Sequence, residues 1–172
     1  MTVSRATLHN YDELTKKGVM LHDQVFIIRA GEVIPEVIGA IVEARTGTEE
    51  SILPPTTCPS CGTPLQRDEG KVALYCPNRR NCPAQIQGKL EVFVGKHGMN
   101  IDGFGKKLVE LFLDIGRLTD FTSVYHLAEH RNEILALEGF QEKSVNNLMN
   151  AIESSRRVEF ANLLVSLGIP QV

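Results

Sequence analysis

Four cysteines lie in one short part of the 172-residue chain and could hold a metal ion. Their spacing is Cys58-x2-Cys61, then fourteen residues, then Cys76-x5-Cys82. Zinc prefers four tetrahedral ligands, and thiolates are good ligands for it. Because all four ligands would be thiols, no coordination position is left for water or substrate. The spacing therefore predicts a structural Zn²⁺ site rather than a catalytic one.

The composition around the cysteines supports this interpretation. Residues 55–83 are rich in proline and poor in apolar side chains, so this segment cannot build its own core and needs a cross-link. The binding energy of structural zinc, roughly 10–16 kcal/mol in peptides, is enough to order it. The alternatives are a disulfide pair, four unrelated buried thiols, or a redox Cys-x-x-Cys. The last lacks the alternating strands and helices of thioredoxin-like proteins.

A second candidate site is a short motif that occurs twice, 36 residues apart. Residues 101–107 read Ile-Asp-Gly-Phe-Gly-Lys-Lys, residues 137–143 read Leu-Glu-Gly-Phe-Gln-Glu-Lys, and residues 169–172 look like the opening of a third copy. In each full copy a glycine turn joins two helical segments. A helix that begins at about Lys106 exposes amide N–H groups and the positive end of its dipole, which favours anions. The turns therefore predict phosphate contacts, with Phe104 anchored in the helical core.

The two copies do not offer the same phosphate-binding residues. The candidate phosphate-binding residues are Gly103, Gly105, Lys106 and Lys107 in the first copy, and Gly139, Gln141 and Lys143 in the second. Glycine tolerates positive φ and permits a close backbone approach. Since Gln141 replaces the second glycine, its side chain would obstruct a phosphate, and we expect the second turn to bind more weakly. A plain helix–turn–helix connection remains the alternative for either copy.

Three parts of the chain would position these residues. Residues 1–54 predict one helix, Tyr11 to Lys17, capped by Asn10 with Glu13 as in a capping box and ended by Gly18. Short β-branched runs follow at residues 25–28 and 37–42, which suit a small barrel or curled sheet. They are too little chain for a closed five-stranded barrel. Residues 55–83 carry the cysteines, and residues 84–172 are helical.

The helical part shows four groups of apolar residues, each sharing one helical face. The groups are Ile86, Leu90, Phe93 and Val94; Leu108, Leu111, Phe112 and Ile115; Val145, Leu148, Met149 and Ile152; and Phe160, Leu163, Leu164 and Leu167. Four matches to one template predict an all-helical module.

The bulk composition limits how the chain could bind its partners. With 42% hydrophobic and 23% charged residues it is an ordinary globular sequence, without a transmembrane run or a signal-like start. We therefore expect a cytoplasmic protein with no membrane partner. Its net charge of −3 is not that of a basic nucleic-acid-binding fold. Any DNA binding would depend on backbone amides, helix N-termini and a few cations.

Together these features resemble the bacterial NAD-dependent DNA ligases. Residues 3–10 (Val-Ser-Arg-Ala-Thr-Leu-His-Asn) and 29–35 (Arg-Ala-Gly-Glu-Val-Ile-Pro) are similar to the OB-fold region of that family. The cysteine spacing resembles its four-cysteine zinc finger. Residues 99–105 and 161–169 resemble its helix-hairpin-helix domain.

The resemblance implies a multidomain α+β protein: a partial OB-fold β-barrel over residues 1–54, a small four-cysteine zinc finger over 55–83, and a truncated all-α helix-hairpin-helix module over 84–172. It implies the DNA-binding portion of an enzyme that seals nicks in duplex DNA during replication and repair, in the bacterial cytosol at the nucleoid. Arg5, within the OB-fold motif, would contact DNA. The zinc finger would connect the two modules that wrap the duplex.

The same resemblance implies limits on activity. The Lys-x-Asp-Gly motif, whose lysine takes AMP from NAD, does not occur in this sequence. NAD and Mg²⁺ would therefore serve only a full-length enzyme, and we expect this chain to be an internal fragment or truncated product, inactive without the missing ligase domains. Two alternatives stay open. One is a complete enzyme that adenylates another lysine, and the other is a zinc-stabilised protein-interaction scaffold without nucleic-acid binding.

Overall fold

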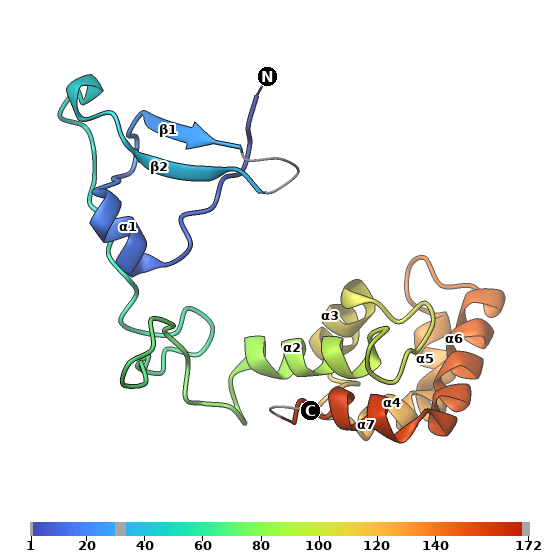
Figure 1. Cartoon of the computed structure of the whole chain (residues 1–172). Coiled ribbons are helices and arrows are strands. Elements are labelled where there is room, and N and C mark those ends of the chain that lie inside the picture. Colours follow the sequence, from blue (N-terminus) through green and yellow to red (C-terminus); the bar gives the residue numbers. More distant parts are fainter. Residues whose placement is uncertain (1, 30–33, 170–172) are drawn as a thin grey trace. The chain divides into compact units, whose positions relative to one another are not determined.

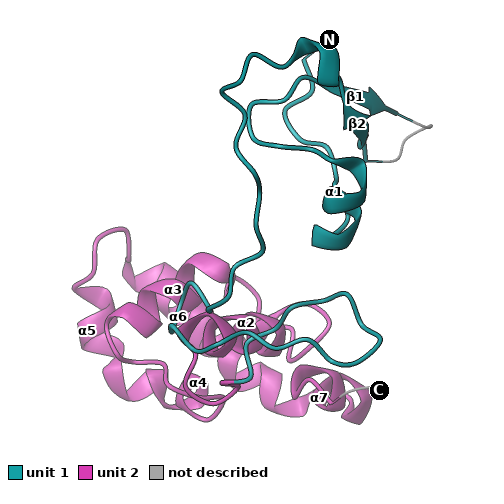
Figure 2. Cartoon of the chain, turned by 90° about the vertical axis from the view of Figure 1, so that its left-hand side faces the viewer, with its two compact units in different colours: residues 1–77 teal, residues 78–172 magenta. Residues whose placement is uncertain are grey.

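Two compact units make up the chain, residues 1–77 and residues 78–172 (Figure 2). The structure is a computed structural model that describes residues 2–29 and 34–169. The middle of the second OB-like motif, at residues 30–33, and most of the third glycine motif, at residues 170–172, lie outside the described residues. Among the described residues, no helix combines the length and the apolar character that crossing a membrane requires.

The first unit contains a short antiparallel sheet and one α-helix (Figure 1). Its elements are α1 (Tyr11–Lys17), β1 (Val25–Ile28), β2 (Glu36–Ala40) and the 3-10 helix η1 (Val42–Ala44). In the β1–β2 pair Val25 lies opposite Ala40, and the register shifts between Phe26 and Ile27. The first predicted strand is confirmed. The second lies at Glu36–Ala40 rather than 37–42, because Val42 already begins the 3-10 turn.

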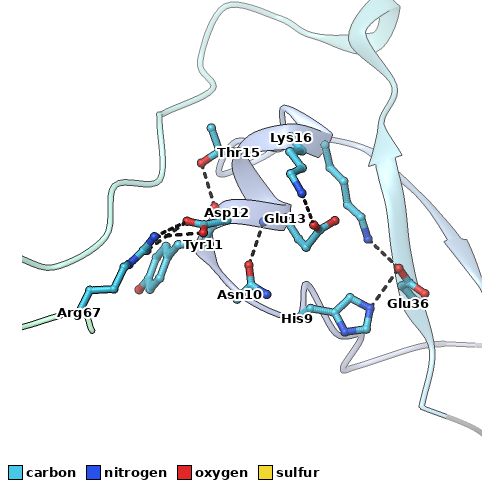
Figure 3. Close-up of polar contacts among 10 residues, drawn as sticks. His9, Asn10, Tyr11, Asp12, Glu13, Thr15, Lys16, Glu36 and Arg67 are labelled. Carbon is cyan, nitrogen blue, oxygen red and sulfur yellow. Dashed lines mark hydrogen bonds and ion pairs between the residues drawn. The ribbon is translucent and has the colours of Figure 1, made fainter. Parts of the chain in front are cut away.

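Helix α1 begins and ends where the sequence predicts. The Asn10 Oδ1 atom accepts a hydrogen bond from the Glu13 N–H at 2.9 Å, and Gly18 closes the helix with φ of +60°. In a full capping box the Glu13 carboxylate would accept a hydrogen bond from the Asn10 N–H. Here it accepts one from Lys16 Nζ at 2.7 Å (Figure 3). Leu14 turns inward from this helix and is buried.

The sheet of the first unit is open in the described residues. It has two strands, supplemented by isolated bridges at Thr7–Glu36 and Leu21–Glu50. Phe26 and Ile28 on β1 are 59% and 51% exposed. A closed barrel would bury apolar side chains on its inner face, so these exposed side chains belong to an open sheet.

All regular elements in the described residues of unit 2 are helices. Its elements are α2 (Pro83–Val94), α3 (Lys106–Asp114), α4 (Ser123–His126), η2 (Leu127–His130), α5 (Arg131–Leu135), α6 (Glu142–Ser154), η3 (Ser155–Arg157) and α7 (Phe160–Ser166). One apolar core joins them, and fully buried members include Phe112, Val109, Val124 and Val145. The predicted helical character from residue 84 onward is confirmed.

The predicted apolar faces fit the first and third groups better than the others. Helix α2 buries Leu90, Phe93 and Val94, and α6 buries Val145, Leu148 and Ile152. On α3 the buried residues are Val109 and Phe112, and Ile115 lies at the C-cap, 36% exposed.

The fourth face is correct for Leu163, which packs against the core, and wrong at its two ends. Phe160 is 72% exposed and Leu167 is 43% exposed, whereas Ser166 is the buried residue of α7. The reason is that Phe160 is the first residue of a seven-residue helix and Leu167 is its C-cap, so neither lies on the packed side of its middle turn.

Candidate metal centre and phosphate-binding turns

The four predicted zinc ligands come together. The Sγ atoms of Cys58, Cys61, Cys76 and Cys82 lie within 4.8 Å of one another, and those of Cys61 and Cys76 are 3.5 Å apart. All four cysteines are reduced thiols, and 3.5 Å is far beyond the roughly 2.05 Å of a disulfide bond. The interpretation of the segment as a disulfide pair is therefore wrong.

A tight turn aims the first two cysteines at one point. The Gly62 N–H donates to the Cys58 carbonyl oxygen and the Cys58 N–H donates to the Thr63 carbonyl oxygen, each at 2.8 Å. Gly62 adopts φ of +70°, a left-handed conformation that L side chains rarely take. The glycine after Cys-x2-Cys is thus required by the turn itself.

Different backbone hydrogen bonds position the second pair, Cys76 and Cys82. Before Cys76, the Gln66 and Tyr75 backbones exchange two hydrogen bonds of 2.9 Å, which closes the loop between the cysteine pairs. After it, the Cys82 N–H donates to the Asn78 carbonyl oxygen at 3.1 Å. The wide x5 spacing therefore contains a turn of its own. Cys82 is the N-cap of α2, and Pro83 is the first helical residue.

Thr63 is a residue of the metal centre that the sequence reasoning missed. Its hydroxyl Oγ1 lies 3.2 Å from Cys61 Sγ. Hydrogen bonds from the hydroxyl and the backbone N–H of Thr63 lower the pKa of the Cys61 thiol to about 6. This favours the thiolate, which is the form that binds metals. A hydroxyl residue two positions after the second cysteine was the available signal.

The thiol cluster fits zinc. Four sulfurs at about 2.3 Å from a tetrahedral ion are separated by roughly 3.8 Å, which is compatible with sulfur separations below 4.8 Å. Cys58 and Cys82 are buried, and Cys61 and Cys76 are half-buried. An all-thiolate set without an open position suits a structural ion, which would cross-link a segment that contains no helix or strand between η1 and α2.

The first glycine motif forms a tight turn ahead of α3. The Phe104 N–H donates to the Ile101 carbonyl oxygen at 3.1 Å, and Gly103 adopts φ of +73°. Gly105 is the N-cap of α3 with extended backbone, at φ of −89° and ψ of −178°. The predicted inward anchor is confirmed, since the Phe104 side chain is buried.

The second motif repeats this geometry ahead of α6. The Phe140 N–H donates to the Leu137 carbonyl oxygen at 3.3 Å, Gly139 has φ of +85°, and Gln141 is an extended N-cap. Ser144 Oγ accepts from the Gln141 N–H at 2.9 Å. The two copies are thus equivalent in backbone, including at the position where glutamine replaces glycine.

Both turns pack on the same buried ring. The Phe112 centroid lies 5.7 Å from that of Phe104 and 6.2 Å from that of Phe140. The core of the second unit therefore fixes both turns from one residue of α3. The sequence repeat corresponds to a repeated structure that shares one aromatic anchor.

The residues predicted to bind phosphate are exposed, and all but one lie in the second unit. Gly103, Gly105, Lys106, Lys107, Gly139, Gln141 and Lys143 flank the two turns, whereas Arg5 lies in the first unit. Lys106 Nζ is 3.8 Å from the Glu110 carboxylate. In the second copy Glu142 takes the place of Lys106 and pairs with Arg131, so that turn is less cationic.

A cluster of four thiols, a small β-sheet unit and a helical unit define the class: a multidomain protein with a site for a structural metal. Comparison with known proteins gives the family. Residues 1–49 match the NAD-dependent DNA ligase OB-fold domain, and residues 57–84 match the NAD-dependent DNA ligase C4 zinc finger domain.

Several relatives match along essentially the whole chain, and each is named DNA ligase. The protein from Fusobacterium nucleatum subsp. nucleatum is 41% identical over 170 residues, that from Pelodictyon phaeoclathratiforme 45% over 171, and that from Thermodesulfovibrio yellowstonii 42% over 172. These alignments cover 99%, 99% and 100% of this chain, and 24%, 25% and 25% of the respective relatives. The chain thus spans about a quarter of their length. It is a homologue of the NAD-dependent DNA ligases and carries their OB-fold and zinc finger domains.

Proposed function

We propose that this chain is the part of an NAD-dependent DNA ligase that holds the DNA duplex while a nick is sealed, and that residues 84–172 act as a helix-hairpin-helix module. The enzyme would work in the cytosol, during replication and repair. NAD and Mg²⁺ would serve the adenylation chemistry of the full-length enzyme, and this chain would carry none of that chemistry alone.

The paired turns are the observation that carries this proposal. Each combines a left-handed glycine, a phenylalanine packed on Phe112, and a helix that starts directly after an extended N-cap. The first-turn amides of such a helix have no intrahelical acceptor and can donate to a phosphate oxygen. Contacts of this kind hold a duplex without reading its sequence.

Gly105 gives the sharpest test. An ideal Cβ at this position would meet no heavy atom within 4 Å, and its backbone conformation is allowed for any residue. Aspartate is also a favourable N-cap, so Gly105→Asp should not weaken the fold. The new carboxylate would occupy and repel the phosphate site. DNA binding should therefore weaken in this variant while the stability of the fold is maintained.

The experiment is fluorescence anisotropy of the zinc-loaded chain with a labelled nicked duplex over a range of salt concentrations. We expect affinity to fall with salt, with a slope of about −0.9 for each phosphate contact. Gly105→Asp should weaken binding by about tenfold, and the matched Gln141→Gly should not weaken it. A wild-type chain that binds no duplex at low salt, or binds with no salt dependence, would refute the proposal.

The non-catalytic part of the proposal has its own measurement. Incubation with NAD labelled in its adenylate should leave no covalent AMP on the chain. An adduct that survives denaturation would instead support a complete adenylating enzyme.

A further inference from the structure

A cationic pocket lies in the second unit, next to Cys82 but separate from the glycine turns. Its cavity is about 180 Å³ and is lined by Arg79, Arg80, Ile86, Lys89, Leu90, Thr119, Asp120 and Phe121. Pockets that enclose a drug-sized ligand are about 300–1,000 Å³. This one therefore suits a single small group.

A turn presents the two arginines. The Asn78 carbonyl oxygen accepts a hydrogen bond from the Cys82 N–H at 3.1 Å, and the Asn78 Oδ1 atom accepts one from the Asn81 N–H at 3.2 Å. Arg79 and Arg80 therefore lie between the ends of this turn. Lys89 on α2 donates from Nζ to the Arg79 carbonyl oxygen at 2.6 Å. The lysine thereby fixes the turn against the helix.

The floor of the pocket is apolar and rigid. Leu90 is buried, and the Phe121 ring stacks on Phe93 with centroids 4.6 Å apart and planes inclined by 16°. A guanidinium group is weakly hydrated and can lie along such a surface while it keeps its donors for a ligand. The two arginines thus line a pocket that also contains an apolar surface, and that surface does not compete for their hydrogen bonds.

The cations of the pocket have no carboxylate partner in the part of the chain that the structure describes. Within residues 2–29 and 34–169, none of Arg79, Arg80 and Lys89 forms an ion pair, whereas many other cations, such as Arg45, Arg67 and Arg117, do. The single carboxylate of the lining, Asp120, accepts from the Thr122 hydroxyl and the Ser123 N–H. Three cationic groups therefore face one carboxylate that is engaged elsewhere, in a chain of net charge −3.

We propose that Arg79, Arg80 and Lys89 form a phosphate-binding pocket that takes a backbone phosphate of the bound duplex, in addition to the phosphates at the glycine turns. The inference rests on the proposed DNA-holding function for the source of the phosphate. Arginine suits the role because its planar fork donates two hydrogen bonds to one phosphate.

The test compares the variant Arg79→Gln/Arg80→Gln with wild type and with Lys71→Gln/Arg117→Gln, which removes the same charge from two cations that already have acidic partners. All three proteins should keep their zinc content and circular dichroism. Binding of the nicked duplex should weaken by about tenfold in the pocket variant, and the salt slope should become shallower by about 0.9 for each phosphate that the protein no longer neutralises. The control variant should keep most of the wild-type affinity for the duplex and most of the wild-type salt slope. Equal effects in the two variants would refute a local pocket.

A second measurement separates this pocket from the DNA-holding proposal. Inorganic phosphate is titrated into the wild-type chain while the arginine Nε–H resonances are followed by NMR. We expect saturating shifts at Arg79 and Arg80 that exceed those at Arg117. Absence of such shifts overturns the pocket even if the duplex binds at the turns. Saturating shifts in a chain that binds no duplex would support the pocket and refute DNA as the source of its phosphate.

Discussion

Gly103 and Gly105 occupy one turn but lack a side chain for different reasons. Gly103 needs its left-handed backbone, at φ of +73°, whereas Gly105 is extended and surrounded by open space. Conformation therefore explains the first glycine and leaves the second free to serve a ligand. The same division holds in the other copy, where Gly139 is left-handed and the extended position tolerates Gln141.

This difference predicts that alanine will cost more stability at Gly103 than at Gly105. Gly103→Ala should lower the free energy of unfolding by about 1–2 kcal/mol, because a Cβ in the left-handed region is strained. Gly105→Ala should lower it by less, about 0.5 kcal/mol, because alanine is a poorer N-cap than glycine but the extended backbone adds no strain. Urea unfolding followed by circular dichroism measures both. Equal losses in the two variants would mean that the turn constrains both glycines.

For single residues, the sequence was most informative where the residue type has few structural or chemical roles. Four thiols at a metal-binding spacing predicted the metal centre, and a phenylalanine between two glycines predicted a buried anchor. It did not reveal Thr63 beside the Cys61 sulfur or the residues that line the pocket around Arg79 and Arg80, because a hydroxyl or a cation has many possible partners. Those contacts depend on which segments the fold brings together.

Among the elements, the cysteine segment depends most on a ligand. Between η1 and α2 it has no helix or strand, and two isolated bridges, Thr57–Pro64 and Gln66–Tyr75, supply its regular backbone pairing. By contrast, the second unit has a continuous apolar core. Metal removal should consequently affect the two regions differently.

Chelation at neutral pH should unfold residues 55–82 and leave the helical signal of the second unit largely intact. The reason is that zinc binding, worth roughly 10–16 kcal/mol in peptides, is the main force that orders the segment. Limited proteolysis should cut within residues 63–75 only after chelation, and Cys58→Ala should give the same cleavage pattern without chelator. A segment that stays resistant after verified zinc loss would show that the metal does not hold it.

The connection after α2 shows a second kind of constraint. A Cβ added at Gly98 would lie 2.4 Å from the Val92 carbonyl oxygen, 2.6 Å from that of Phe93 and 3.1 Å from Ser166 Cβ. The chain therefore needs a residue without a side chain here, although φ at this position is not left-handed. Gly88, within α2, has nothing within 4 Å of an added Cβ.

Gly98→Ala and Gly88→Ala should change stability in opposite directions. The first should destabilise the second unit by about 1–3 kcal/mol, because backbone atoms must move to admit the methyl group. The second should stabilise it by about 0.5–1 kcal/mol, since alanine is the better residue in a helix interior. Denaturant unfolding of the two variants beside wild type checks both signs. A neutral Gly98→Ala variant would contradict the close packing of this connection.

Gly98 lies beside Ser166, the residue of α7 whose burial the sequence pattern does not predict. The sequence pattern favoured Phe160 and Leu167 for the buried side of α7, but Ser166 is buried there, next to Gly98. Periodicity identifies apolar residues and carries no information on how much room the neighbouring segment leaves. The faces of α2 and α6 were predicted correctly, because the apolar residues at helical spacing are the ones that these two helices bury.

Across the whole molecule, the two units are stabilised by different forces. Between residues 78 and 169, the second buries fifteen apolar residues in one cluster. In the first, buried apolar residues are few among those described, and charged groups tie its elements together. Glu36 on β2 accepts a hydrogen bond from Lys17 and forms an ion pair with His9. The Arg67 guanidinium donates hydrogen bonds to both carboxylate oxygens of Asp12 (Figure 3).

Asp23 is the most enclosed of these charges. Its side chain is fully buried and accepts from Arg45 at 2.8 Å and from the Met20 N–H at 2.7 Å. The Arg45 guanidinium, together with the Met20 N–H, holds the pKa of Asp23 below its ordinary value of 3.8. In the same way Lys17, followed by His9, lowers the pKa of Glu36 below 4.5.

We predict that acid unfolds the first unit before the second. A carboxyl whose pKa is lowered by folding contributes its full stabilisation above its ordinary pKa and loses it as the pH falls through the lower, folded value. Asp23 and Glu36 should therefore weaken the first unit progressively below about pH 4.5, because protonation removes the charge that Arg45 and Lys17 face. In the second unit, hydrogen bonds with Thr122 and His126 also lower the pKa of Asp120 and Glu129, but both carboxyls lie outside the apolar core, which does not titrate.

Amide hydrogen exchange, resolved by residue and measured between pH 7 and pH 3, distinguishes the two units after correction for the intrinsic exchange rate. Protection of β1 and β2 should fall first, while that of α6 persists. Asp23→Asn serves as the control: it should lower protection of the first unit at pH 7 and flatten its dependence on pH, since the titrating group is gone. Simultaneous loss of protection in both units, or an unchanged pH dependence in Asp23→Asn, would mean that these ion pairs do not set the acid stability of the sheet.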